Sequence, residues 1–184
     1  MSHYNITSND VFQERVYTYF IQSTDRTTGT ANNCTFTINW TNFLPESHNE
    51  YNVFFKCETQ SNYFLDFSSS AFAVNANFGS RSFTYDSTTN CPSYKIGFVK
   101  KDASQTSAST NIMYANYLEN PPISIGRPQG NSLSVWFINP TTNTYAVNTN
   151  SSGVSQTTLC DWQMELQFIP IKTSLIENKR FQDT

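Results

Sequence analysis

The chain has 184 residues, enough for one domain with a substantial core, and 14% of them are charged against about 25% in typical globular proteins. The net charge is −3 and no basic cluster occurs, which argues against direct nucleic-acid binding through phosphate neutralisation. No apolar run approaches the ~20 residues of a membrane helix, so membrane insertion is not expected either. Asn, Ser and Thr make up roughly a third of the chain and aromatic residues 15%, a composition that favours an all-β fold over disorder.

The first half of the chain alternates between β-type runs and turn formers. Strands are predicted over 16–23, 35–40, 51–59, 71–78 and 81–85. In the second run, Phe36, Ile38 and Trp40 alternate with polar residues, so these three side chains are expected to point into the core and Thr35, Thr37 and Asn39 outward.

The second half continues the pattern, with strands predicted over 94–100, 111–118, 122–125, 133–139 and 162–171. Alternation places Tyr94, Ile96 and Phe98 on one face of their strand. The turn residues Gly126, Pro128 and Gly130 predict a hairpin between 122–125 and 133–139. The inward residues of the last strand are expected to be Trp162, Met164, Leu166 and Phe168.

About eight to ten strands with loops of unequal length predict a β-sandwich, and the single eight-stranded jelly roll is the member that fits best. An immunoglobulin-like sandwich is the alternative, but Trp40 lies too near Cys34 on the same strand for its Cys–Trp–Cys pattern. The domain is expected to span residues 17–172. Residues 1–16 are expected to form an N-terminal arm and residues 173–184, a weak helix candidate, a C-terminal tail.

Four glycosylation sequons begin at Asn5, Asn33, Asn39 and Asn150. The N-terminus lacks a basic region followed by an apolar stretch, so no signal peptide is expected, and the sequons are interpreted as incidental in an Asn- and Thr-rich chain.

Cysteines occur at positions 34, 57, 91 and 160, with no C-x-x-C pair that would indicate a zinc or redox motif. Buried thiols are favoured. Two disulfides among Cys34, Cys57, Cys91 and Cys160 remain an alternative whose pairing the sequence does not determine.

Residues typical of catalysis are sparse. His3 lies in the predicted arm and His48 in a polar loop, neither beside a recognisable nucleophile, and no predicted inner strand carries the histidines of a metal-binding cupin. The acidic residues are scattered and suggest no catalytic pair: Glu46, Glu50, Glu58, Asp66, Asp86, Glu119, Asp161 and Glu165. The glycines match no phosphate-binding loop. We therefore expect a non-enzyme and nominate no catalytic, cofactor-binding or metal-ligating residue.

The three tryptophans, Trp40, Trp136 and Trp162, lie on alternating strands and are most simply core residues. A sugar-stacking platform, since indole rings stack well on sugars, and an anchor in a protein interface are the alternatives. This leaves open a carbohydrate- or ligand-binding module whose site lies on loops, with Trp136 or Tyr145 as contacts.

Several stretches resemble the single jelly-roll minor capsid and penton proteins of large icosahedral DNA viruses, of the nucleocytoplasmic type. These stretches are "IQSTDRTTGTANNCTFTINWTNFLP", "YNVFFKCETQSN", "NPPISIGRPQGNSLSVWFIN" and "WQMELQFIPI". A Ser-x-x-Arg-x-x-Gly-like lead before the first core strand corresponds here to Ser23, Arg26 and Gly29.

The resemblance implies a non-catalytic structural protein that joins or stabilises major capsid capsomers. Its partners would be the major capsid protein and other minor capsid proteins, and in a vertex role it would form a homo-pentamer. It would reside in the virion, assembled in the host cytoplasm. The uncharged polar surface predicted for the strands agrees with side-by-side packing, because charge repulsion between copies is low.

Overall fold

The structure, a computed structural model, describes residues 15–60, 71–78, 85–86, 91–92, 94–101, 112–115, 120–147 and 159–171. Within these ranges the chain is almost entirely β, with helical residues only in the 3-10 turn η1 (Ser23–Asp25) and the single turn α1 (Trp40–Phe43). The strands are β1 (Tyr17–Gln22), β2 (Thr28–Thr30), β3 (Asn33–Thr37), β4 (Glu50–Gln60), β5 (Ala71–Ala76), β6 (Tyr85–Asp86), β7 (Cys91–Pro92), β8 (Lys95–Lys101), β9 (Ile112–Ala115), β10 (Ile123–Gly126), β11 (Ser132–Asn139), β12 (Thr144–Tyr145) and β13 (Trp162–Pro170).

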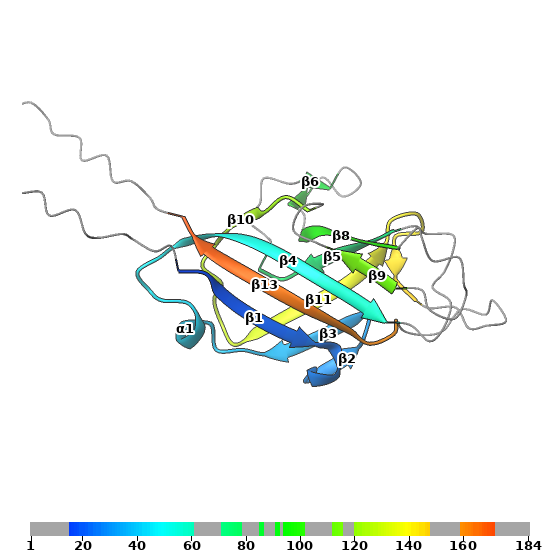
Figure 1. Cartoon of the computed structure of the whole chain (residues 1–184), viewed down its shortest axis with the longest axis horizontal. Helices are drawn as coiled ribbons and strands as arrows, with labels where there is room; N and C mark the ends of the chain where they lie inside the picture. Colours follow the sequence, from blue (N-terminus) through cyan, green and yellow to red (C-terminus); the bar gives the residue numbers. More distant parts are fainter. Residues whose placement is uncertain are drawn as a thin grey trace, which may run out of the picture.

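The main strands form one antiparallel hydrogen-bonded path, β1-β13-β4-β9-β8-β5-β11-β3-β2, while β6 and β7 pair separately. This path folds into two layers. In Figure 1, β1, β13 and β4 lie in front, and β3 and β11 cross behind them. Strand β10 pairs with the start of β4, and β9 links the far end of β4 to the end of β8. The predicted all-β sandwich is confirmed.

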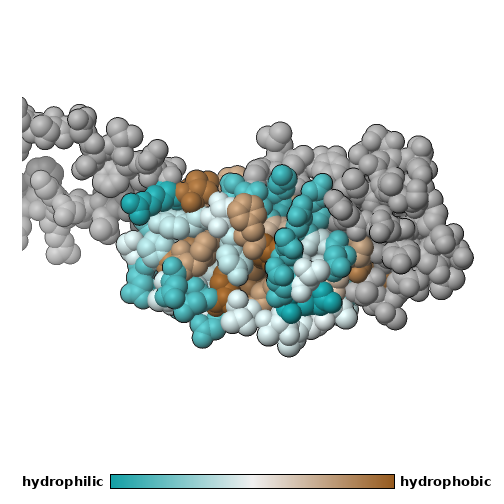
Figure 2. All heavy atoms as spheres, turned by 60° about the horizontal axis from the view of Figure 1, so that its bottom comes forward, coloured by the Kyte–Doolittle hydropathy of each residue, from teal (hydrophilic) through white to brown (hydrophobic). Residues whose placement is uncertain are grey.

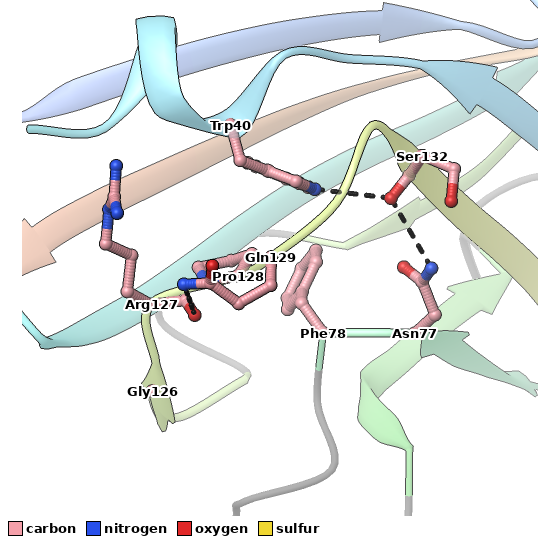
Figure 3. Close-up of a pocket in the computed structure, with 8 residues that line it drawn as sticks. All are labelled: Trp40, Asn77, Phe78, Gly126, Arg127, Pro128, Gln129 and Ser132. Carbon is pink, nitrogen blue, oxygen red and sulfur yellow. Dashed lines mark hydrogen bonds between the residues drawn. The ribbon is translucent and has the colours of Figure 1, made fainter. Parts of the chain in front are cut away.

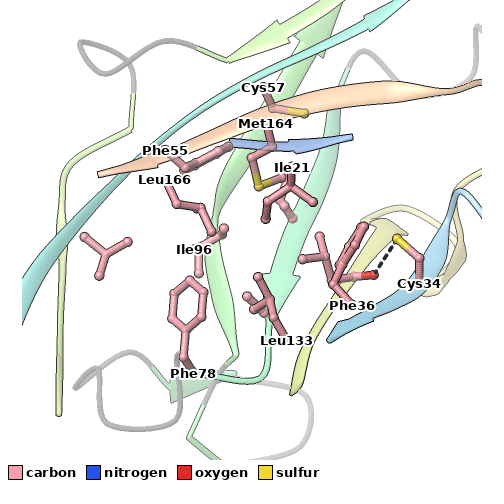
Figure 4. Packing of buried hydrophobic residues seen from close by; sticks show 14 of the residues in the cluster. Ile21, Cys34, Phe36, Phe55, Cys57, Phe78, Ile96, Leu133, Met164 and Leu166 are labelled. Carbon is pink, nitrogen blue, oxygen red and sulfur yellow. Dashed lines mark hydrogen bonds between the residues drawn. The ribbon is translucent and has the colours of Figure 1, made fainter. Parts of the chain in front are cut away.

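Aromatic rings join the two layers. The ring of Trp162 on β13 lies 5.2 Å from that of Phe137 on β11 and 6.1 Å from that of Phe36 on β3, centroid to centroid. At the other end of β13, the ring of Phe168 lies 5.8 Å from Trp40 and 5.7 Å from Phe78. The buried residues of both layers therefore form one core, part of which is shown in Figure 4.

Strand β13 follows its sequence pattern. The four residues predicted to point inward, Trp162, Met164, Leu166 and Phe168, are all buried, and the residues between them are exposed or half-buried. Val53, Phe55 and Cys57, at alternating positions of β4, are likewise buried. A strand with one face on the core buries every second side chain, which is why alternation identified the inward residues of β13.

The strand predicted over 35–40 has the inward residues that were expected, but it ends earlier than expected. Phe36, Ile38 and Trp40 are buried as expected, yet β3 ends at Thr37 and Trp40 begins α1. The side chain of Asn39 caps this turn, since its Oδ1 accepts a hydrogen bond from the N–H of Asn42 at 3.1 Å. Pro45 then disfavours helical backbone at the residue before it, so the helix stops after one turn.

The predicted hairpin between 122–125 and 133–139 is wrong. Strand β10 pairs with β4 in the front layer, whereas β11 pairs with β3, β5 and β12 in the back layer. The segment containing Gly126, Pro128 and Gly130 is therefore a crossing between layers. Turn-forming residues mark where a chain changes direction, but they do not determine which strand it meets next.

The prediction that Tyr94, Ile96 and Phe98 share a face is also wrong. Ile96 and Val99 are buried, while Tyr94 and Phe98 are exposed. The pairing of β5 with β8 shifts register between Val74 and Asn75, which adds one residue to the β8 side at Gly97.

The side chain of Asn120 secures this bulge. Its Oδ1 accepts from the N–H of Phe98 at 2.8 Å and its Nδ2 donates to the carbonyl of Phe98 at 3.1 Å. A Cβ at Gly97 would collide with Asn120 and with the ring of Phe55, so only glycine has room there.

Several predicted segments lie outside the described residues: most of the N-terminal arm, all of the C-terminal tail, residues 79–84, and the ends of the strand predicted over 111–118. The domain limits of 17 and 172 thus stay predictions. Among the described residues, no helix is long and apolar enough to span a membrane.

Replacing Trp40 by alanine should lower the free energy of unfolding by about 3–5 kcal/mol, because a large, fully buried ring would be lost from the junction of the two layers. Urea denaturation followed by circular dichroism would measure the change. Val16→Ala, at an exposed position, is the control and should alter stability by less than about 0.5 kcal/mol. A loss below about 1 kcal/mol for Trp40→Ala would contradict the packing described above.

Candidate functional site

The side chains capable of acid–base chemistry are dispersed over the described surface. Glu46 and Glu50 are exposed near the start of β4, and His48, between them, lies with its ring 6.3 Å from that of Tyr51. On the outer face of the front layer, Glu58 and Glu165 accept hydrogen bonds from glutamine side chains. Within the described part of the chain, no three His, Cys, Asp or Glu residues are grouped closely enough to hold a metal ion. His3, Asp66 and Glu119 lie outside it, as does the side chain of Asp86.

Ser23, Arg26 and Gly29, the residues of the Ser-x-x-Arg-x-x-Gly-like lead, form a structural junction with the start of β13. The buried hydroxyl of Ser23 donates to Asp161 Oδ1 at 2.8 Å and accepts from the N–H of Trp162 at 3.0 Å. Arg26 Nη1 donates to the carbonyl of Ser23 at 2.6 Å and lies 3.8 Å from Asp161 Oδ1. The junction thus ties the end of β1 to residues almost 140 positions later in the chain.

The same arginine also fixes the turn into β2. Its Nε donates to the carbonyl of Gly29 at 3.2 Å. Gly29 has φ +93°, a left-handed conformation that favours glycine, and a Cβ there would collide with the carbonyl of Asn33. Trp162 completes the junction by donating its indole N–H to the carbonyl of Ala31 at 2.6 Å. The lead residues therefore hold a chain corner in place, and Asp161 is a partner that the sequence pattern did not reveal.

A pocket of about 280 Å³ opens between the start of α1 and the crossing from β10 to β11 (Figure 3). It is lined by Trp40, Asn77, Phe78, Gly126, Arg127, Pro128, Gln129 and Ser132. Most of its polar groups are already engaged: Trp40 Nε1 and Asn77 Nδ2 both donate to the carbonyl of Ser132, and Arg127 Nη2 donates to the carbonyl of Leu44. Among the described residues, Arg127 Nε is the one buried side-chain polar atom without a hydrogen-bond partner. These contacts support the crossing and leave the pocket without converging groups for chemistry.

The three tryptophans separate into two kinds. Trp40 and Trp162 are buried, as expected, but Trp136 is half-buried on the outer face of β11, which corrects its placement in the core. The ring of Trp136 packs across β5 against the ring of Tyr94, with 5.7 Å between the ring centroids. Tyr145 lies opposite Ile138 on the same outer face, and its hydroxyl accepts from Asn33 Nδ2 at 3.0 Å.

Tyr94, Phe98, Trp136 and Tyr145 together form an outer aromatic surface on the back layer. Lys95 adds a cation, with Nζ 5.2 Å from the centre of the Phe98 ring. Trp136 and Tyr145 were predicted as contacts of an alternative ligand-binding module. Alternation wrongly placed Tyr94 and Phe98 on the same face as Ile96. Gly97 was the available signal, because an isolated glycine within a strand often marks a bulge that inverts the alternation.

Three of the four cysteines have side chains that the structure describes, and all three are thiols; the side chain of Cys91 lies outside the described part. Cys34 and Cys57 are buried, Cys160 is half-buried, and none of the three forms a disulfide, which agrees with the prediction of buried thiols at the first two positions. Cys34 Sγ lies 3.7 Å from the carbonyl of Val135 (Figure 4). Burial raises the pKa of Cys34 to about 12 and also raises the pKa of Cys57. Thiols with raised pKa are poor nucleophiles at neutral pH, so these two have a packing role.

No protein-family model matches the chain, and none of the curated proteins matches it either. Its function must therefore be inferred from its own fold and surfaces.

Ser23→Ala should lower the free energy of unfolding by about 1–3 kcal/mol, because the N–H of Trp162 would lose its acceptor in a buried place. Ser124→Ala is the matched control: its hydroxyl donates to Asn52 Oδ1 at 2.8 Å on an exposed surface, and its loss should cost less than about 0.5 kcal/mol. Equal losses for the two variants in urea denaturation would show that the junction is not a stabilising feature.

The buried thiols predict a fall in stability at alkaline pH. The unfolded chain releases the Cys34 proton near the ordinary pKa of 9.0 but the folded chain only near 12, so the folded state binds more protons between these values. The free energy of unfolding should therefore decrease as pH rises above about 9, by up to about 1.4 kcal/mol per pH unit for each such thiol. Urea denaturation across this range should show a shallower decline for Cys34→Ala. An identical decline would rule out a contribution from Cys34.

Proposed function

We propose that this protein is a non-catalytic structural subunit of an icosahedral virus capsid, a minor capsid or penton protein built on a jelly roll. The observation that carries the proposal is the strand order. We take eight main strands and number them one to eight in chain order: β1, β3, β4, β5, β8, β10, β11 and β13. Side by side in space, the strands of the front layer are then the first, eighth, third and sixth, and those of the back layer are the second, seventh, fourth and fifth. This order supports a jelly roll, a fold common in viral capsid subunits.

The surfaces support the same role. Outward residues of β3 and β11 include Asn33, Thr35, Thr37 and Ser134, and Thr35 Oγ1 lies 2.9 Å from Ser134 Oγ across the strands. The face in Figure 2 is mostly hydrophilic or neutral, with hydrophobic side chains in separate small groups. Uncharged polar groups hydrogen-bond to neighbours while adding little charge repulsion, which suits subunits that pack side by side.

The ends of the domain suit a joining function. Tyr17 at the start of β1 lies opposite Phe168 near the end of β13, so the first and last strands of the domain begin and end side by side. A neighbouring subunit that contacts this end of the front layer meets both strands. In this role the partners are the major capsid protein and other minor capsid proteins, and the site of action is the virion.

A carbohydrate-binding module is the second candidate, since jelly rolls also occur in lectins. The observation that favours it is the outer aromatic surface, where Trp136 and Tyr94 present adjacent rings and Tyr145 is exposed. Aromatic rings stack against the apolar faces of sugars. The two candidates differ in what they bind: a protein lattice or a free glycan.

Incorporation into particles tests the capsid role most directly. An epitope-tagged chain supplied during infection by the virus that encodes it should co-purify with intact virions at a fixed ratio to the major capsid protein, measured by quantitative mass spectrometry. Ser23→Ala, with its weakened fold, should incorporate less, whereas Ser124→Ala should incorporate as the parent does. A chain absent from purified virions would contradict the proposal.

A glycan array tests the second candidate. Binding by the parent that Trp136→Ala abolishes and Val16→Ala preserves would support a sugar site on the outer aromatic surface. The capsid proposal predicts no such Trp136-dependent signal.

A further inference from the structure

The outer edge of β1 is the one long strand edge that the described chain leaves unpaired and unprotected. Within the described residues β1 pairs on one side only, with β13. A six-residue edge presents a row of backbone N–H and C=O groups that another strand can pair with. Proteins usually protect such edges with charged side chains, prolines, bulges or very short strands.

The other edges carry that protection. In β8, which pairs with β9 only at its last two residues, the remaining edge contains a lysine, a glycine and a bulge. Strand β2 has three residues, one of them Gly29. Strand β10 has four residues and follows directly on Pro121 and Pro122, which lack backbone N–H groups. Strand β1, "YTYFIQ", contains no charge, proline or glycine. The contrast marks β1 as an edge that is suited to pairing with another strand.

The side chains of β1 point to the same conclusion. Tyr19 and Ile21 face inward, with Ile21 buried and Tyr19 packed against Phe43. The outward row contains Phe20, which is 72% exposed, more than any other large hydrophobic residue of the described chain. Val16, also exposed, continues this row just before the strand. An exposed phenylalanine on an unprotected edge is otherwise a hazard for aggregation.

We propose that β1 is a homodimer interface, in which the β1 strands of two copies pair antiparallel about a two-fold axis and join their front layers into one sheet. Directly opposite residues of an antiparallel pair point to the same face, so Phe20 can lie opposite Phe20 of the partner copy. In that register Thr18 lies opposite Gln22 of the partner copy. An aromatic pair across the axis is a favourable cross-strand contact.

Charge selects this register. With Phe20 on the axis, Arg15 lies beside η1 of the partner copy, which contains Asp25, and the symmetry repeats this proximity of a basic and an acidic side chain at the other end. Arg15 and Asp25 are exposed and flank β1 without belonging to it. A shift by two residues would displace Arg15 by about 7 Å along the partner strand, and a shift by one would turn Phe20 against the core face of its neighbour.

The neighbouring charges are compatible with the pairing. Phe20 lies opposite Glu165 of β13, which lies opposite Lys56 of β4, so each copy contributes one acidic and one basic side chain to this row. Because a six-residue edge buries limited area, the dimer should dissociate on dilution. The interface needs only the edge of β1 and is independent of the proposed capsid role.

Sedimentation velocity of the full chain over a concentration series tests the proposal. The parent should shift from monomer to dimer as concentration rises. Phe20→Lys places two like charges on the axis and should weaken the dimer about ten-fold or more. The variant should stay folded, because Phe20 is 72% exposed. Tyr145→Lys, an exposed aromatic on the other layer, is the matched control and should dimerise as the parent does.

Two further variants test the register. Arg15→Glu and Asp25→Arg should each weaken the dimer, and the double variant should restore it. Phe20→Cys should form an intermolecular disulfide on mild oxidation, since residues opposite each other in an antiparallel pair have suitable Cα separations. The parent, whose Cys34 and Cys57 are buried, serves as the control for this cross-link.

A parent that stays monomeric at all concentrations would overturn the proposal, and so would a dimer that Phe20→Lys leaves unchanged. A closed pentamer insensitive to Phe20→Lys would overturn it too while supporting a vertex role. Absence from virions would contradict the capsid proposal and leave the dimer unaffected.

Discussion

The position of β13 between β1 and β4 is the constraint on which the sandwich depends. This last strand pairs with the first strand on one side and with the longest strand on the other, so it holds the front layer together. Its two large rings, Trp162 and Phe168, reach across to the back layer at opposite ends of the core. Ser23 and Asp161 fix where β13 begins, and with it the register of every inward side chain.

The sequence predicted features that depend on local alternation and failed where distant contacts decide. Strand β13 was recognisable because each inward residue alternates with a solvent-facing one. The hairpin failed because β10 finds its partner in β4, at a distance that no local turn signal encodes. In β8, one glycine shifted the alternation and turned Phe98 outward. Trp40 is buried as predicted although its backbone is helical, because burial depends on where the side chain lies and not on the type of secondary structure.

The candidate functional residues show the same division. Ser23, Arg26 and Gly29 were singled out by the resemblance to minor capsid proteins, but their partner Asp161 is separated from them by most of the chain and became evident only in the fold. The outer aromatic surface likewise joins Tyr94 to Trp136 across an intervening strand. Functional surfaces of a sandwich are assembled across strands, so a linear pattern identifies their members one at a time.

The central place of β13 has a consequence for biosynthesis. The strand that completes the front layer is synthesised after the other strands of that layer. Tyr17 can pair with Phe168 only after about 150 further residues have been synthesised. Until then β1 and β4 have no strand between them, and each exposes an edge that β13 will later cover. Because such long-range pairing is slow to form, the edges of β1 and β4 stay exposed in the nascent chain and can pair with other strands. Factors that shield strand edges during translation should therefore matter more for the yield of this protein than factors that stabilise its finished core.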